Sequence, residues 1–195
     1  MLFDSIYKPL YDMQDWQLAA FSAASCERIF PHFALFDHLT EGNRAVVART
    51  ALDQVWKQLA LRGNMNVDAQ LTKVEAILHD DTDDSFGASL AFDALVSLIA
   101  TLNCVDNANY EDAASSAQLS RESVAKYVEL GSEDDLSDEQ LIRHIETHEL
   151  MISEMDFQAQ VISMLSQAKV AKAAMIDQLK DFAMADGVSN IGVSV

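Results

Sequence analysis

Two histidines four residues apart, His144 and His148, are the first residues here whose type and spacing could do chemistry. On an unbroken helix they share one face and could both reach one zinc ion. The zinc-protease pattern, however, places a glutamate directly after the first histidine. Here Ile145 follows, and Glu146 lies about 200° around the helix from His144. A structural zinc site also takes four ligands, and no cysteine is near in the sequence. We therefore expect no metal site and keep the two histidines only as weak candidates.

A charged residue inside an apolar stretch marks a second candidate. Asp93 is the only charged residue in ASLAFDALVSLIATLNCV, residues 88–105. A buried carboxylate is costly unless it is paired or hydrogen-bonded. Arg28, in CERIFP, is the most suggestive partner because its guanidinium offers a fork of donors, and Glu27 beside it could complete a network. Two interpretations stay open: a structural ion pair or an aspartate that reaches the surface, and a functional pocket built on Glu27, Arg28 and Asp93.

The elements that position these residues are predicted to be helices. DWQLAAFSAASCERIF repeats apolar residues at spacings of three and four, which is typical of an amphipathic helix. Pro31 is expected to end that helix and to begin the next. The stretch 88–105 is apolar on nearly every side, but its polar residues argue against a lipid environment. Such a helix in a soluble protein lies at the centre of a bundle.

The C-terminal third contains no glycine or proline between Gly131 and Gly187. One helix over residues 138–186 would be about 74 Å long, whereas a domain of this size should be about 40 Å across. We expect a break between Arg143 and Thr147, with Thr147 as the new cap. From residue 157 to residue 182 the apolar stripe continues, and residues 188–195 are predicted to form an extended tail.

Composition agrees with a helical fold. Half of the residues are apolar, and six glycines and two prolines leave little material for hairpins. The sequence therefore predicts one all-α domain, residues 1–195, built as a bundle of about six to eight helices around the central apolar helix.

The net charge of −18 results from 31 acidic and 13 basic residues. Such a field repels phosphate backbones and anionic membrane surfaces, so we expect neither nucleic acid nor membrane as a partner. Solubility explains the charge most simply, while attraction of a basic partner and imitation of nucleic acid stay open. Cys26 and Cys104 lie 78 positions apart in apolar segments, which indicates buried, reduced thiols and a cytoplasmic location.

Several stretches together resemble one known family. CERIFPHFALF, LDQVW, AFDALVSL and the terminal SNIGV, in this order, are similar to the YjaG-like family of small bacterial proteins, domain-of-unknown-function family 416. The likeness runs from DWQLAAF near the start to SNIGV at the end. It implies an all-helical bacterial cytosolic protein. It implies no activity, ligand or catalytic residue.

No catalytic signature is present in the sequence: it holds no GxSxG, Walker loop or GxGxxG. We therefore assign no catalytic residue and no cofactor. The expected function is that of a non-enzymatic protein-interaction module, and a homodimer through the apolar-striped C-terminal helix is one form such contacts could take. The alternative is a protein that binds a small ligand or a metal in a buried polar pocket near Glu27, Arg28 and Asp93.

Overall fold

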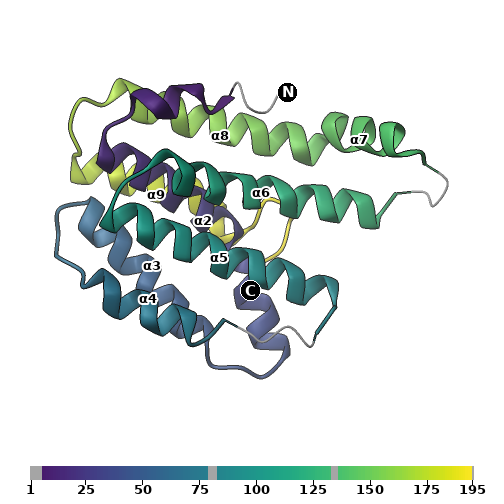
Figure 1. Ribbon diagram of the computed structural model, residues 1–195, viewed down its shortest axis with the longest axis horizontal. Coiled ribbons are helices and arrows are strands. Elements are labelled where there is room, and N and C mark those ends of the chain that lie inside the picture. Colours follow the sequence, from purple (N-terminus) through teal and green to yellow (C-terminus); the bar gives the residue numbers. More distant parts are fainter. Residues whose placement is uncertain (1–5, 79–82, 133–135, 195) are drawn as a thin grey trace.

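The two most apolar stretches of the chain become its two central helices, α2 (Asp15–Leu39) and α5 (Phe86–Asp106). They pack along each other in the computed structural model, which describes residues 6–78, 83–132 and 136–194 (Figure 1). In these ranges every regular element is a helix and no strand occurs. The all-α prediction, with its central apolar helix, is confirmed.

The described ranges hold six further α-helices, most of which pack against this pair. α3 (Ala45–Leu59) and α4 (Val67–Glu75) cover one side, and α6 (Tyr110–Leu130) packs against both central helices. On the opposite edge, α7 (Asp138–Thr147) and α8 (Glu149–Gln167) follow each other almost end to end beside α6 (Figure 1). α9 (Ala173–Met184) packs on α2 and α3. The short 3₁₀ turns η1 (Lys8–Asp12) and η2 (Ala185–Gly187) lie near the two ends of the chain.

Helix α5 alone is long and apolar enough, among the described residues, to be tested as a membrane span. Of its most apolar window, 61% is buried inside the bundle. Leu95, Leu98 and Leu102 are almost completely buried against neighbouring helices. The residues that make this helix apolar therefore supply the core of the bundle.

Pro31 does not end a helix, contrary to expectation, because α2 runs without interruption from Asp15 to Leu39. A proline inside a helix removes one backbone hydrogen bond and costs roughly 3 kcal/mol. The flanking side chains Ile29 and Phe33 are at most 1% exposed, and α2 packs against five other α-helices. Burial on both sides of the proline outweighs the lost hydrogen bond.

The predicted break in the C-terminal third exists, but its cap is wrong by one residue. α7 ends at Thr147, and His148 is the N-cap of α8. Its Nδ1 accepts a hydrogen bond from the backbone N–H of Leu150 at 3.2 Å. The Thr147 hydroxyl instead donates back to the carbonyl oxygen of Arg143, so Thr147 belongs to the preceding helix.

A second break, between Gln167 and Ala173, was not predicted. It turns the chain so that α9 packs on α2, with Ile176 and Leu179 almost completely buried. The apolar stripe from residue 157 onward is thus shared between two helices and is used largely inside the chain. A homodimer would need a surface other than the buried part of this stripe.

The C-terminal segment is not extended, which corrects a further expectation. The backbone N–H of Ser189 donates to the carbonyl oxygen of Val193, and that of Gly192 donates to the carbonyl oxygen of Ser189. Gly192 has φ +81°, a left-handed conformation that favours glycine. This turn buries Ser189, Asn190 and Ile191, so the segment belongs to the core.

Candidate functional site

The two candidate histidines lie at the junction of α7 and α8, where their ring centroids are 5.9 Å apart. Because Nδ1 of His148 caps α8, that nitrogen is already hydrogen-bonded. Nowhere in the described ranges do three or more His, Cys, Asp or Glu side chains form a group that could hold a metal ion. The helix break turns the pair into part of a helix junction.

Glu27 is held in a network that joins α2 to α3. Its carboxylate accepts two hydrogen bonds from the Arg49 guanidinium, at 2.5 and 2.9 Å, and one from the indole Nε1 of Trp56 at 2.7 Å. Arg49 also pairs with Asp53, which in turn accepts a hydrogen bond from Nζ of Lys180 on α9. Only 4% of Glu27 is exposed, so this carboxylate has a structural role: it connects α2 to α3.

Arg28 points to the other side of α2. Its Nε lies 3.4 Å from the carboxylate of Glu154 on α8, and its guanidinium carbon lies 4.8 Å from the ring centroid of Phe157. The expected pair between Arg28 and Asp93 is therefore wrong.

Asp93 pairs with Lys126 on α6, whose Nζ donates to Oδ2 of Asp93 at 2.5 Å and to the hydroxyl of Ser89 at 2.9 Å. Burial raises the pKa of the Asp93 carboxyl in spite of this partner. Glu27, Arg28 and Asp93 thus belong to three separate networks with different partners, because Asp93 faces α6, while α2 directs its two neighbouring charges to α3 and α8. The three residues therefore do not surround one common pocket.

Glu154 is a buried charged residue that the sequence reasoning missed, as it also missed Asp37. It is fully buried and accepts hydrogen bonds from the Ser120 hydroxyl at 2.7 Å and from Nε2 of Gln158 at 2.8 Å. Burial raises the pKa of its carboxyl. Its spacing of three from Met151 and from Phe157, both buried, places it on the apolar stripe of α8 and could have revealed it.

The same network ties down both ends of the chain. The hydroxyl of Tyr7 donates to Oε1 of Gln158 at 2.8 Å. The amide Nδ2 of Asn190 donates to the carbonyl oxygen and the hydroxyl of Ser120 and to the hydroxyl of Ser123. Nε2 of His32 shares a hydrogen bond of 3.0 Å with the Ser189 hydroxyl. These contacts are buried, so their first role is to fix the segments around Tyr7 and around Ser189 and Asn190 on the bundle.

An open hollow of about 690 Å³ lies between α8 and the segment formed by α9 and η2; we call it the α8–α9 hollow. Both helices pack against α2 with little contact between them, which leaves the space open. Across it the rings of Phe157 and Phe182 stack, with centroids 5.3 Å apart and planes inclined by 22°. Ile152 is 50% exposed and Phe182 36% exposed, so apolar surface reaches solvent here.

Four carboxylates surround this apolar surface. Glu149 and Asp156 lie on the exposed face of α8, and Asp181 and Asp186 come from α9 and η2. None of the four takes part in an ion pair with another residue that the structure describes. Arg28 is the single basic residue among those that line the hollow, and it is committed to Glu154 and Phe157.

The two cysteine thiols, Glu27 and Glu154 are all buried in the core. Burial raises the pKa of Cys26 to about 12 and that of Cys104 to about 11, so both thiols stay protonated at neutral pH. Glu27 is fixed by Arg49 and Trp56, and Glu154 has no exposed surface. The carboxylates and apolar side chains of the α8–α9 hollow, by contrast, are exposed to solvent.

Comparison with known proteins bears on the whole chain. The family model DUF416, described as "Protein of unknown function (DUF416)", matches residues 5–194. The chain is 31% identical over 192 residues to an uncharacterized protein of Haemophilus influenzae, with 96% of each chain covered. It is 29% identical over 196 residues to the uncharacterized protein YjaG of Escherichia coli K12, with 99% of this chain and 98% of that protein covered.

A solved structure agrees with these sequence matches. The crystal structure of a DUF416 family protein from Shewanella baltica OS155 superposes with a TM-score of 0.87 at 29% identity. The superposition covers 97% of this chain and 98% of that one. The resemblance drawn from the sequence motifs is confirmed.

Proposed function

Because the chain belongs to the DUF416 family of proteins of unknown function, we propose its role from its own geometry: it is a non-enzymatic module that binds a positively charged segment of a partner protein. The α8–α9 hollow is the binding site. The observation that carries the proposal is the combination of four exposed, unpaired carboxylates with exposed apolar surface in one hollow, as far as the described residues go. A basic segment with an apolar side is complementary to both features.

Charge supports this choice of partner at two levels. The net charge of −18 attracts cations from a distance and speeds their encounter with the protein. Close to the surface, the carboxylates of Asp156 and Asp181 approach the hollow from opposite sides, one from α8 and one from α9. A cationic segment lying in the hollow meets both.

The apolar surface explains why the partner is more than a diffuse polycation. Ile152 and Phe182 expose apolar area that binding would remove from water, at about 25 cal/mol per Å². No three carboxylates among the described residues converge as metal ligands do. Their spread over two helices fits a segment of several residues, and about 690 Å³ accommodates several side chains.

Binding of designed peptides tests the proposal. Three 16-residue peptides of equal length carry Lys with Leu, Glu with Leu, and Lys with Ser in the same amphipathic pattern. We expect measurable binding, by fluorescence anisotropy at 50 mM salt, for the Lys–Leu peptide alone. Raising the salt to 300 mM should weaken it, since exposed charge pairs are screened. Equal binding of the Glu–Leu peptide, or no binding of the Lys–Leu peptide, would refute the proposal.

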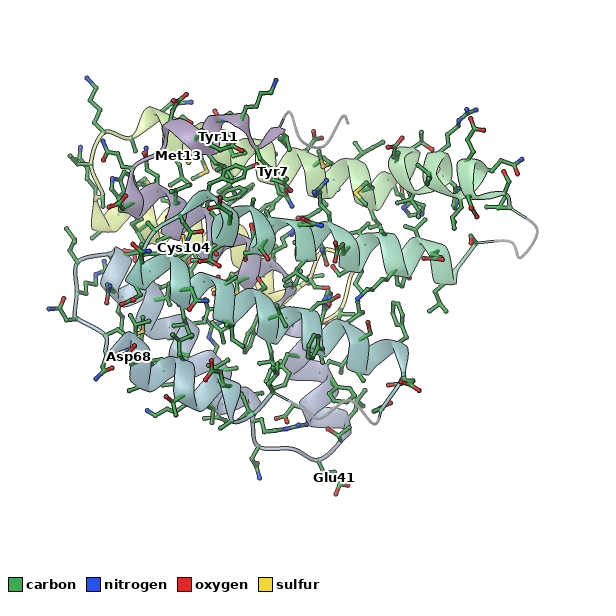
Figure 2. All side chains as sticks on the ribbon, in the orientation of Figure 1. Tyr7, Tyr11, Met13, Glu41, Asp68 and Cys104 are labelled. Carbon is green, nitrogen blue, oxygen red and sulfur yellow. The ribbon has the colours of Figure 1, made fainter. Side chains whose placement is uncertain are left out.

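Matched variants locate the site. The double variant Asp156→Asn, Asp181→Asn removes two charges at the hollow, and Glu41→Gln, Asp68→Asn removes two exposed charges elsewhere. Figure 2 shows Glu41 and Asp68 on the side of α3 and α4, away from α8. We expect the first variant to weaken binding at least tenfold and the second by less than threefold. Equal weakening would mean that net charge alone, and not the hollow, binds the peptide.

The cytoplasm of a bacterial cell is the location we propose with this function. Both cysteines are free and buried, which fits a reducing compartment.

A further inference from the structure

We infer that the residue that anchors the partner in the α8–α9 hollow is an arginine, stacked on the exposed face of the Phe182 ring. This inference rests on the proposed function and names its specificity. It follows from two stacked rings, Phe157 and Phe182, of which, in the described ranges, only Phe157 has a guanidinium of the protein beside it.

The inner side is that of Phe157. The Arg28 guanidinium lies over the Phe157 ring, 4.8 Å from its centroid, and the Phe182 ring is stacked on the same Phe157 ring. Phe157 therefore contacts both a guanidinium and a second ring. Glu154 accepts a hydrogen bond from Nε of Arg28 at 3.4 Å. The inner layer is therefore a guanidinium held by a ring and by a carboxylate.

The outer side has an aromatic ring and carboxylates, as the inner side does, but no guanidinium that the structure describes. Phe157 covers one face of Phe182, and 36% of Phe182 is still exposed, toward the hollow that it lines. Within the described part of the chain, no cation lies over this ring. Asp181 is its neighbour in sequence, Asp186 follows on η2, and both line the same hollow. The outer layer has a ring face and carboxylates and is open to a guest cation.

Guanidinium suits this place better than ammonium. An arginine side chain is planar and weakly hydrated, so it stacks on an aromatic face while its edge donates hydrogen bonds to carboxylates. A lysine ammonium is a compact point charge that holds its water more strongly and has no plane to stack on the ring. A guest arginine on Phe182 would repeat the contact that Arg28 makes with Phe157, with carboxylates near both guanidinium groups.

The test moves one arginine through the Lys–Leu peptide. Each lysine is replaced in turn by arginine, so the register of binding need not be known in advance. Arginine at the best position is then replaced by citrulline, which keeps the shape and loses the charge. We expect the best arginine peptide to bind roughly three- to tenfold more tightly than the all-lysine parent, and the citrulline peptide to bind less tightly than the parent.

Phe182→Leu is the decisive variant, because it keeps apolar surface and removes the aromatic face. It should weaken binding of the best arginine peptide more than binding of the lysine parent, so that the two peptides bind about equally and the preference for arginine is lost. Tyr127→Leu, which removes another exposed ring (43% exposed, on α6), is the matched control and should keep the preference. Thermal melts of both variants check that they are folded.

The outcomes separate this inference from the proposed function. If the lysine parent binds and no arginine position improves on it, or if Phe182→Leu keeps the preference, the arginine anchor is wrong and the proposed function stands. If no peptide binds to the wild type, both fail. Binding of free arginine amide as tight as that of the peptide would identify the site as a small-molecule site and would also overturn the inference.

Discussion

Glu27→Gln is the sharpest test of how buried charge holds this bundle together. In the folded protein two nitrogen atoms of Arg49 and the indole nitrogen of Trp56 all donate to the Glu27 carboxylate. The amide of glutamine keeps only one accepting oxygen, so at least one of these donors must face an NH₂ group. The substitution changes shape very little, which makes the lost acceptor its main effect.

The expected loss follows from the burial of the two partners. Breaking a buried ion pair by changing one member typically costs 3–5 kcal/mol. Glu27 is 4% exposed, but the Arg49 side chain is 29% exposed and keeps its contact with Asp53. These features place the loss at about 2–4 kcal/mol. For a chain of this length a loss of about 3 kcal/mol lowers Tm by roughly 6–12 °C.

Calorimetry and urea unfolding measure the loss, with Glu75→Gln, an exposed change on α4, as control. A double-mutant cycle with Arg49→Met separates the pair from its surroundings. We expect a coupling free energy of at least about 1.5 kcal/mol between positions 27 and 49. A loss below about 1 kcal/mol in Glu27→Gln, or a cost of Arg49→Met that is the same in both backgrounds, would refute the reasoning.

Three further predictions concern pH and close packing. Burial lowers the pKa of His32 from 6.5 to about 4, so the folded state favours the neutral ring. The free energy of unfolding should therefore fall as pH drops from about 6.5 to 4. His32→Gln should remove up to about 3 kcal/mol of that fall, measured by urea titrations. Burial instead raises the pKa of Glu154 above 4.5, so ionisation costs stability as pH rises; Glu154→Gln should therefore compare more favourably with the wild type at pH 8 than at pH 4 in the same assay. Gly42→Ala should lower stability by about 2 kcal/mol, seen as a lower Tm, because the added methyl group would overlap the Asp37 carboxylate that accepts hydrogen bonds from the backbone N–H groups of Arg44 and Ala45.

Local signals predicted most of the fold because they depend on near neighbours in the chain. Serine three residues before glutamine, and asparagine before an apolar stretch, favour the start of a helix; Ser137 with Gln140 begins α7 in this way, and Asn66 begins α4. The errors are at places where tertiary packing decides. Pro31 stays inside a helix because the residues on both sides of it, Ile29 and Phe33, are buried in the bundle. The segment that turns at Gly192 is held because Asn190 donates hydrogen bonds to Ser120 and Ser123.

The candidate site was harder to predict because the partner of a charge is set by helix rotation. Sequence identified Asp93, Arg28 and Glu27 as charges in apolar surroundings, and two of them, Asp93 and Glu27, are buried. It could not show that two adjacent residues on α2, about 100° apart around its axis, pair with different helices: Glu27 with Arg49 on α3 and Arg28 with Glu154 on α8. The α8–α9 hollow depends on a break at residues 168–172 that carries no glycine or proline signal.

The distribution of charge links the fold to the proposed function. Arg28, Arg49, Lys126 and Lys180 each pair with a carboxylate on another helix, so these cations are used to hold the bundle together. The chain has only 13 basic residues and 31 acidic ones. Each basic residue that forms an ion pair between helices is therefore no longer available to pair with a carboxylate on the surface. At the α8–α9 hollow this imbalance coincides with exposed apolar surface beside α8 and α9. The positive charge missing at that place is what a basic partner would supply, and for this reason substitutions in the hollow should weaken binding while leaving the internal ion pairs, and the stability they provide, almost unchanged.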